Sequence, residues 1–342
     1  MRPFDVMIGL ALAGLATDAA AQTSPSFDCS KATTAIEKTI CADKDAAAAD
    51  RAMADAYRRL LESLGNPAAR THLQRDQMAW LTDRQRICGS PSGAAGGRTM
   101  PLCLTELATA RAERLAALPA GNAYSFVGER RLVERGRRGG VSYNIAVSYA
   151  VFEFADINYA GVNGTIKAWA EKFAADVRPS TQGNAGGPTE IGWFLDSGHV
   201  VHAASRDLVT VAAHWLLFTG GAHPNNGRIA WQVALTSGSL LRLDDIFGPA
   251  SLWPEAATRL VQADLKKQFE ERPGNEESLE PAVLRKMVVD ARRWIFARDS
   301  VKVTFDPYEV GPYAAGPYEV ELSYGALAPY IRTDGPLASR AR

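Results

Sequence analysis

The stretch SYNIAVSYAVFEF, Ser142–Phe154, decides how the chain divides. Its apolar residues alternate with polar ones or follow one another, which is the pattern of a β-strand. The residues before it, 28–118, are rich in Ala, Arg, Asp and Leu and have apolar positions at helical spacing. The sequence therefore predicts a multi-domain protein: a small disulfide-stapled all-α domain followed by an α+β domain with a mostly antiparallel sheet.

Local signals place four helices in the first half. Thr34-Ala-Ile-Glu37 has the form of a capping box and begins a short helix that ends near Cys41. A second helix ends before Gly65, a third begins near Pro67, and a fourth follows from about residue 103 to residue 118. On one face of the third helix lie Gln77, Trp80, Arg84 and Cys88.

The second half mixes helices and strands. Helical spacing recurs in residues 157–176, in a helix that begins at Pro254, and in residues 281–292. The last predicted strand places Tyr318, Val320, Leu322 and Tyr324 on one face. The other short strands are predicted at residues 191–195, 199–203, 208–215, 229–235, 294–296 and 301–305.

The N-terminus has the features of an export signal. Arg2 precedes an apolar run from Val6 to Ala16, and Ala19-Ala20-Ala21 offers a small-residue cleavage site. The run is too short to span a bilayer, and no second long apolar run follows it. Residues 1–21 are therefore predicted to be a signal peptide. The mature protein is predicted to be periplasmic or secreted, with no integral membrane segment.

All four cysteines lie in the first third of the chain: Cys29, Cys41, Cys88 and Cys103. In an oxidising compartment an even number of cysteines favours disulfides. Four cysteines allow three pairings, and the spacing leaves all three open. A zinc site is the alternative, but the spacings are wide and the sequence has no Cys-x-x-Cys motif. We therefore expect two disulfides and no metal.

A basic stretch, GERRLVERGRRGG (Gly128–Gly140), joins the two halves. It could contact an anionic polymer, but a solvated hairpin or linker is the simpler interpretation. The predicted organisation is a signal peptide over residues 1–21, a helical domain over 22–120, a basic linker or hairpin over 121–140, and the α+β domain over 141–342.

Composition and motifs argue against several functional classes. The formal net charge is zero, whereas nucleic-acid binding usually needs a basic excess. The sequence has neither a Gly-x-Ser-x-Gly elbow nor a phosphate loop. His199 and His202 would point to opposite faces of a strand, which does not suit a metal pair. Two groups of carboxylates could supply a pair for acid–base chemistry, but the sequence does not fix their geometry. They are Asp244 with Asp245, and Glu276 and Glu277 with Glu280. We expect no enzyme, no catalytic residue, no cofactor and no nucleic-acid partner.

The stretch FDPYEVGPYAAGPYEVEL, Phe305–Leu322, contains three evenly spaced Pro-Tyr pairs. Proline restricts a loop before it binds, so less free energy is lost on ordering it. Tyrosine combines an apolar ring with a hydroxyl, which favours interface anchors. Packing at a sheet edge is the alternative role, and it is favoured for Tyr318 and Tyr324. The turn at His223 could border the same surface or simply support the fold. The predicted partner-binding residues are Pro307, Tyr308, Pro312, Tyr313, Pro317 and His223.

Two parts of the chain resemble known families. Within residues 27–118, FDCSKATTAIEKTICADKDAAAADRAMADAYRRLL, QMAWLTDRQRIC and CLTELATARAERLAAL resemble the LprI-type helical domain, including its four cysteines. The stretch FTGGAHPNNGRIAWQVALTSGSLLRLDDIFGP (Phe218–Pro249) and the Pro-Tyr stretch resemble the extracytoplasmic domain of RsiV-type anti-sigma factors. That second resemblance extends over roughly residues 143–331.

Both resemblances imply the same kind of partner. LprI-type proteins are named as lysozyme inhibitors, and the RsiV-type domain is a receptor for lysozyme. They imply an exported protein that binds lysozyme or a related peptidoglycan-cleaving muramidase, and they leave open whether binding inhibits the enzyme. Acidic residues around the Pro-Tyr pairs would suit a basic enzyme: Asp306, Glu309, Glu319 and Glu321. The alternative is an envelope module that binds peptidoglycan or another cell-wall polymer through the junction arginines: Arg130, Arg131, Arg135, Arg137 and Arg138.

Overall fold

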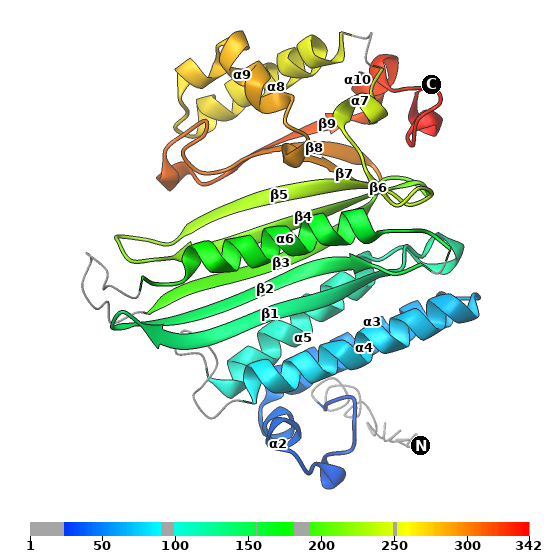
Figure 1. Ribbon diagram of the computed structural model, residues 1–342, viewed down its shortest axis with the longest axis vertical. Coiled ribbons are helices and arrows are strands. Elements are labelled where there is room, and N and C mark those ends of the chain that lie inside the picture. Colours follow the sequence, from blue (N-terminus) through cyan, green and yellow to red (C-terminus); the bar gives the residue numbers. More distant parts are fainter. Residues whose placement is uncertain (1–23, 90–98, 155, 181–191, 249–251, 342) are drawn as a thin grey trace, which may run out of the picture.

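The computed structural model describes residues 24–89, 99–154, 156–180, 192–248 and 252–341. The predicted signal peptide lies outside these residues. In Figure 1 the helices of the first half lie at the bottom, a large sheet lies in the middle, and a small sheet covered by helices lies at the top. Within the described residues, no helix is both long and apolar enough to cross a bilayer.

The helices of the first half begin where the sequence predicts. The Thr34 side chain accepts the Glu37 N–H, and the Glu37 side chain accepts the Thr34 N–H, so the predicted capping box is confirmed. Pro67 lies in the first turn of its helix, where a missing N–H costs little. The elements are η1 (Cys29–Lys31), α2 (Ala35–Ala42), α3 (Lys44–Ser63), α4 (Pro67–Cys88), α5 (Met100–Ala117) and η3 (Gly121–Ala123).

The two predicted disulfides are confirmed. Cys29 pairs with Cys41, which ties η1 to the end of α2. Cys88 pairs with Cys103, which ties the end of α4 to the start of α5. The pairing that the sequence left open is therefore the one that joins neighbouring cysteines along the chain.

Six strands form the large sheet, in the order of the chain. Among the described residues, its one parallel pair is β2 with β3, and α6 (Ala160–Val177), which lies between these strands in the chain, packs on one face of the sheet. The other neighbouring pairs are antiparallel, as predicted. The strands are β1 (Val127–Arg138), β2 (Val141–Phe152), β3 (Trp193–Ala203), β4 (Leu208–Phe218), β5 (Asn225–Ala234) and β6 (Ser239–Leu240).

Two stretches are more regular than the sequence suggested. Residues 127–138, within the predicted linker or hairpin, form β1, which pairs with β2 along its whole length. The two short strands predicted at residues 191–195 and 199–203 are one strand, β3. The position of Gly198, in the middle of β3, has no room for a side chain because the His214 ring lies against it. A Cβ there would lie 2.7 Å from His214 Nε2.

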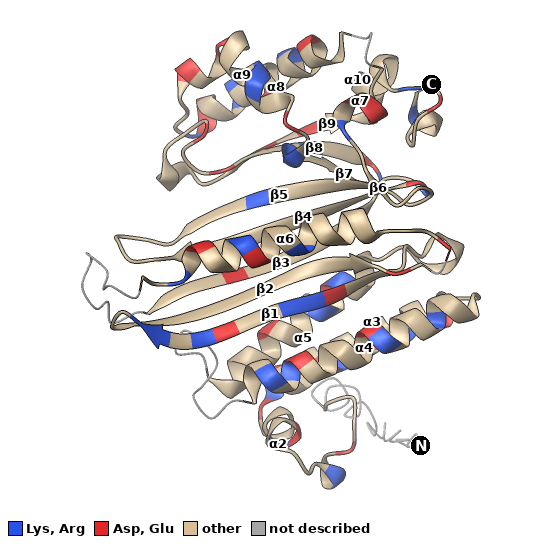
Figure 2. Ribbon diagram, in the orientation of Figure 1, with Lys and Arg blue, Asp and Glu red and all other residues tan. Residues whose placement is uncertain are grey.

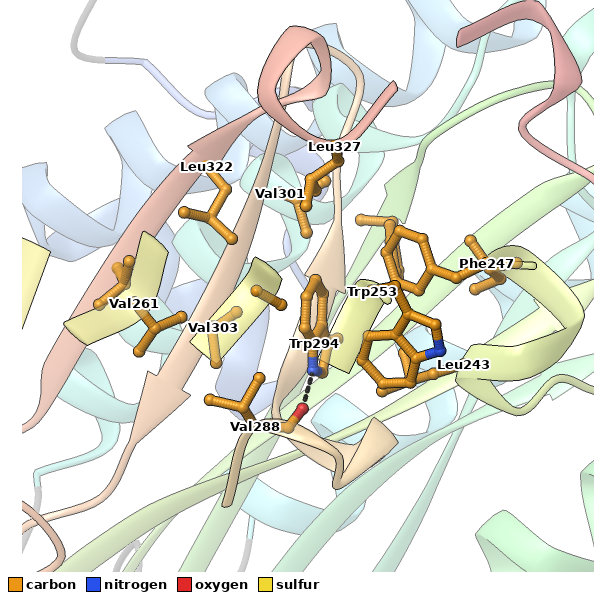
Figure 3. Packing of buried hydrophobic residues seen from close by; sticks show 14 of the residues in the cluster. Leu243, Phe247, Trp253, Val261, Val288, Trp294, Val301, Val303, Leu322 and Leu327 are labelled. Carbon is orange, nitrogen blue, oxygen red and sulfur yellow. Dashed lines mark hydrogen bonds between the residues drawn. The ribbon is translucent and has the colours of Figure 1, made fainter. Parts of the chain in front are cut away.

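The small sheet is antiparallel and holds its own core. Its strands are β7 (Trp294–Phe296), β8 (Ser300–Phe305) and β9 (Tyr318–Ser323). Trp294 is completely buried, packs near Trp253 and Phe247, and donates its indole N–H to the Val288 carbonyl at 2.7 Å (Figure 3). The helices around this sheet are α7 (Leu243–Ile246), α8 (Trp253–Glu271), η4 (Glu276–Leu279), α9 (Pro281–Val288), η5 (Ala291–Arg293), η6 (Tyr313–Ala315), α10 (Tyr324–Leu327), η7 (Ala328–Tyr330) and η8 (Ala338–Arg340).

The helical half and the large sheet share one hydrophobic core. Buried residues of α4 and α5, such as Leu73 and Leu115, belong to the same cluster as Val127 of β1, Phe152 of β2 and Ile166 of α6. The small sheet is joined to the large one through β7: Ile295 packs against Ala212 and Ala230, and the Gln232 side chain donates to the Trp294 carbonyl at 2.6 Å. The two halves are therefore expected to unfold together.

Removing one disulfide tests this coupling. Replacing Cys88 and Cys103 by serine opens a link of sequence separation 15, which corresponds to about 3 kcal/mol of unfolding free energy. Because the core is shared, we expect one cooperative unfolding transition at a lower temperature, seen alike by circular dichroism and by tryptophan fluorescence. Loss of the helical signal well below the fluorescence transition would contradict a shared core.

Candidate partner-binding surface

Two loops that are far apart in sequence lie side by side at the left of Figure 1. One joins β4 to β5 and contains His223; the other joins β8 to β9 and contains Tyr308 and Tyr313. The His223 and Tyr313 rings stack with 3.7 Å between their centroids and 20° between their planes. The Tyr308 hydroxyl lies 3.3 Å from His223 Nε2, and the Tyr313 hydroxyl donates to the Pro224 carbonyl. These three rings form one cluster, which we call the aromatic surface.

Tyr308 is exposed to solvent and has a strained backbone conformation. Its side chain is 64% exposed, and its φ of 74° lies in the left-handed region that a bulky residue rarely adopts. The other described non-glycine residue with positive φ, Phe126, packs against Tyr124 and Phe154, which accounts for its conformation. Tyr308 contacts only the edge of the cluster, with its ring centroid 5.6 Å from that of Tyr313, and most of its surface faces solvent, so the strained backbone suggests a function for the exposed ring.

Ion pairs and hydrogen bonds fix the turn under Tyr308. The Tyr308 N–H donates to the Gly311 carbonyl at 3.1 Å. The Glu309 carboxylate accepts two bonds from Arg293, one of them at 2.7 Å, and one from the Asp306 N–H. The Asp306 carboxylate accepts the Arg228 N–H at 3.0 Å, which ties the turn to β5. The loop is therefore held in shape before any partner arrives, which lowers the entropy lost on binding.

The three Pro-Tyr pairs divide into two roles. Tyr318 is 1% exposed, its hydroxyl donates to the Pro273 carbonyl at 2.5 Å, and the Arg272 guanidinium lies over its ring. The predicted packing role of Tyr318 therefore agrees with its position, and Tyr324 is also buried. Pro312 precedes η6, and the Pro317 carbonyl accepts an Arg272 N–H at 3.0 Å. Only the first two pairs present a tyrosine ring to solvent.

The acidic residues of this loop are largely neutralised inside the protein. Glu309 is paired with Arg293, and Glu319 is paired with Arg228 and Lys302. Attraction of a basic partner by these carboxylates is therefore weaker than the sequence suggests. The aromatic surface therefore offers a partner mainly aromatic contact rather than charge.

Burial raises the pKa of the Asp306 carboxyl from 3.8 to about 6, and Glu309 adds to the rise. The folded state therefore binds this proton more tightly than the unfolded state, so the unfolding free energy should fall as pH rises from about 4 to about 6. Asp306→Asn cannot ionise, and we expect it to lose this fall in urea unfolding measured between pH 4 and pH 7.5. The charged groups that face Asp306 are Arg228, Arg293, Glu309, Asp290, Arg292, Lys172 and Asp176.

Asp299→Asn, at an exposed position before β8, is the matched control for loss of a carboxylate. It should keep the pH profile of the parent protein. A parent-like profile in Asp306→Asn would show that another group causes the dependence.

The LprI-like face of α4 lies inside the protein. Gln77 and Trp80 are buried, and Arg84 pairs with the buried Asp50 at 3.1 Å. Arg111 of α5 donates twice to Gln77 Oε1, at 3.0 and 3.1 Å, and lies 5.9 Å from the Trp80 ring centroid. These side chains connect helices to one another, so they are not available to an external partner.

A buried charge cluster continues from this face to β1. Arg111 Nη2 lies 2.8 Å from Asp76 Oδ2, and Arg111 Nη1 lies 3.6 Å from Glu129 Oε2. Arg131 also pairs with Glu129 at 2.8 Å, and nearby positive charges outweigh burial to hold the pKa of Glu129 well below its usual range. The cluster therefore joins α4, α5 and β1 by charge as well as by apolar contact.

The histidines and carboxylates considered as chemical sites have structural surroundings. His199 is buried beside Arg114 and Ser148, whereas His202 lines a different cavity that contains Lys302. Asp244 accepts the Trp253 indole N–H at 3.1 Å. In the described part of the chain, no group of three or more His, Cys, Asp or Glu residues could hold a metal ion.

Three of the five junction arginines have partners within the protein. Arg130 pairs with Glu153 at 2.6 Å, Arg131 pairs with Glu129, and Arg135 donates to the Ile87 carbonyl at 2.7 Å. Arg137 and Arg138 are exposed at the end of β1. Figure 2 shows acidic residues interspersed with the basic ones along this strand. The junction is therefore a less basic surface than its sequence suggests.

Comparison with known families assigns the two ends of the chain. Residues 29–115 match the family described as "Lysozyme inhibitor LprI". Residues 244–325 match the family described as "Protein of unknown function (DUF3298)", which is the RsiV-type domain. The chain is therefore a fusion of an LprI-type domain with a DUF3298 domain. Tyr308 and Tyr313 lie within the DUF3298 match, and His223 lies outside both matches.

Two solved structures of DUF3298 proteins are similar to this chain. One, from Bacteroides fragilis NCTC 9343, is 15% identical with a TM-score of 0.42, and the match covers 63% of this chain and 96% of that one. The other, from Pseudomonas aeruginosa PAO1, is 19% identical with a TM-score of 0.37, and the match covers 60% of this chain and 94% of that one. No curated protein matches the chain.

Proposed function

We propose that this protein is an exported, non-enzymatic binding protein that binds and inhibits a lysozyme or a related peptidoglycan-cleaving muramidase. The observation that carries the proposal is Tyr308, a strained and exposed aromatic residue on a loop that ion pairs hold in place. The LprI match supports a protein partner of the lysozyme kind. The two disulfides fit an oxidising compartment outside the cytoplasm.

The aromatic surface suits insertion into a cleft. The Tyr308 ring supplies apolar area and a hydroxyl donor, and Pro312, Ala314 and Gly316 keep the adjoining loop narrow. The cleft of a glycosidase of this kind contains two catalytic carboxylates, which accept hydrogen bonds from hydroxyl and N–H donors. A loop that occupies this cleft would block the glycan substrate, so binding would inhibit the enzyme.

A titration tests the proposal. The oxidised full-length mature protein is added to C-type, G-type and I-type lysozymes while lysis of purified cell wall is followed. Inhibition of at least one class near equimolar protein, together with a complex on size-exclusion chromatography, is the expected result. If no class is inhibited or bound, while the protein sediments with purified wall in the absence of lysozyme, the proposal fails and direct polymer binding replaces it.

A further inference from the structure

A pocket with aromatic walls lies between α6, the strands β4 and β5, and Asp306, which follows β8. Its volume is about 310 Å³, which is at the lower end of the range of small-ligand pockets. Trp169 and Phe173 of α6 and Trp215 of β4 line it, and all three side chains are only half-buried. Part of each ring therefore borders open space.

The rings form a corner rather than a packed stack. Phe173 and Trp215 are 5.3 Å apart between centroids, with 77° between their planes. Trp169 lies 5.6 Å from Phe173 on the next turn of the helix. Half-buried aromatic faces around an open pocket leave apolar surface in contact with water, and a ligand with a flat apolar face would remove it.

The pocket is lined by as many positive as negative side chains. Lys172 and Asp176 form an exposed ion pair at 2.6 Å on one side. Arg228 and Asp306 lie on the other, where the Asp306 carboxylate accepts the backbone N–H of Arg228 and the Arg228 guanidinium pairs with Glu319. Two positive and two negative side chains give no net charge, so the pocket does not select an ion. They do supply both donors and acceptors of hydrogen bonds.

A glycine makes this arrangement possible. A Cβ on Gly227 would lie 2.3 Å from Trp215 Cζ2 and 2.6 Å from Asp306 Oδ2. Any larger residue would therefore displace the aromatic wall and the carboxylate together. The absence of a side chain at this position of β5 brings an aromatic ring and a hydrogen-bonding group to the same pocket.

We propose that this pocket binds a neutral saccharide, one or two sugar rings of a glycan chain. The apolar C–H face of a sugar ring would stack on the Trp215 and Phe173 corner, and its hydroxyls would bond to Asp176, Lys172 and Asp306. Aromatic faces together with polar groups whose charges balance suit a polyol better than they suit a peptide or an anion. This inference goes beyond the proposed function and does not depend on it, because no muramidase is involved.

The test is a titration of the full-length protein, without lysozyme, with two neutral probes: the trimer of N-acetylglucosamine and cellotriose. We expect saturable binding of at least one trimer with a dissociation constant of about 1 mM or lower, followed by calorimetry and by tryptophan fluorescence. Trp215→Ala should weaken binding at least about tenfold. Because that variant removes a half-buried ring, Lys172→Ala with Asp176→Ala, at exposed helix positions, provides a second test and should weaken binding severalfold.

Trp193→Ala is the matched control, because Trp193 is a half-buried tryptophan at the start of β3 and does not line the pocket. It should bind the trimer as the parent protein does. No saturable binding of either trimer up to about 10 mM would overturn the proposal. Equal affinity in the parent protein, Trp215→Ala and the Lys172/Asp176 double variant would also overturn it. Neither outcome bears on lysozyme binding by the aromatic surface.

Discussion

Replacing Tyr308 and Tyr313 by alanine together should weaken binding to lysozyme by about 100-fold or more, while the melting temperature changes by only a few degrees. Aromatic anchors at the centre of an interface commonly contribute 2 kcal/mol or more each on truncation to alanine. Tyr308 is 64% exposed, so its removal opens no cavity in the core. The affinity is measured by calorimetry or surface plasmon resonance, and stability by thermal unfolding.

Tyr308→Gly tests whether the Tyr308 side chain contributes to binding rather than to the stability of the fold. Glycine adopts positive φ without strain, so this variant should be at least as stable as the parent protein, yet it should lose most of the affinity that Tyr308 provides. Tyr57→Ala, on the remote helix α3, is the control and should retain full affinity per folded molecule. If the double variant unfolds while its folded fraction binds normally, the aromatic surface is structural and the site lies elsewhere.

Arg111→Met should be the most destabilising single substitution in the charge cluster. Arg111 is completely buried, and its removal leaves the buried carboxylate of Asp76 without its nearest cation. Loss of one partner from a buried ion pair typically costs about 3–5 kcal/mol, which is a large part of the stability of an ordinary domain. Urea unfolding at pH 7 measures the effect.

Two further variants show whether charge is the cause. Arg58→Met removes an exposed arginine that pairs with Asp55 and should cost less than about 1 kcal/mol. Combining Arg111→Met with Asp76→Asn should recover part of the lost stability, because the unpaired charge is removed. Equal losses in Arg111→Met and Arg58→Met would contradict a role for the cluster in joining α4, α5 and β1.

Local chemistry allowed much of the fold to be predicted. The capping box at Thr34, the proline that begins α4 and the period-two pattern of β9 each act within a few residues, so the sequence contains the whole signal. The buried cluster was not predictable in this way. Asp76, Arg111 and Glu129 come from three elements and meet only when the chain folds, and each looks like an ordinary surface charge in the sequence.

The candidate site shows the same division. The Pro-Tyr pairs could be recognised from their spacing, and alternation along β9 separated Tyr318 from the exposed tyrosines. The anchoring role of Arg293 had no sequence signal, because Arg293 and its partner Glu309 are 16 residues apart and meet only when β7 pairs with β8. The pocket at Trp215 was missed because helical spacing assigns Trp169 and Phe173 to a buried face, and spacing does not show where that face ends.

Hydrogen exchange on the complex with an inhibited lysozyme would locate the interface most directly. The proposal predicts that new protection of backbone amides concentrates in the β4–β5 loop, residues 219–224, and the β8–β9 loop, residues 306–317, with little change in α4 and α5. Protection concentrated on α4 and α5, with these two loops exchanging as in the free protein, would contradict the claim that the aromatic surface is the binding site.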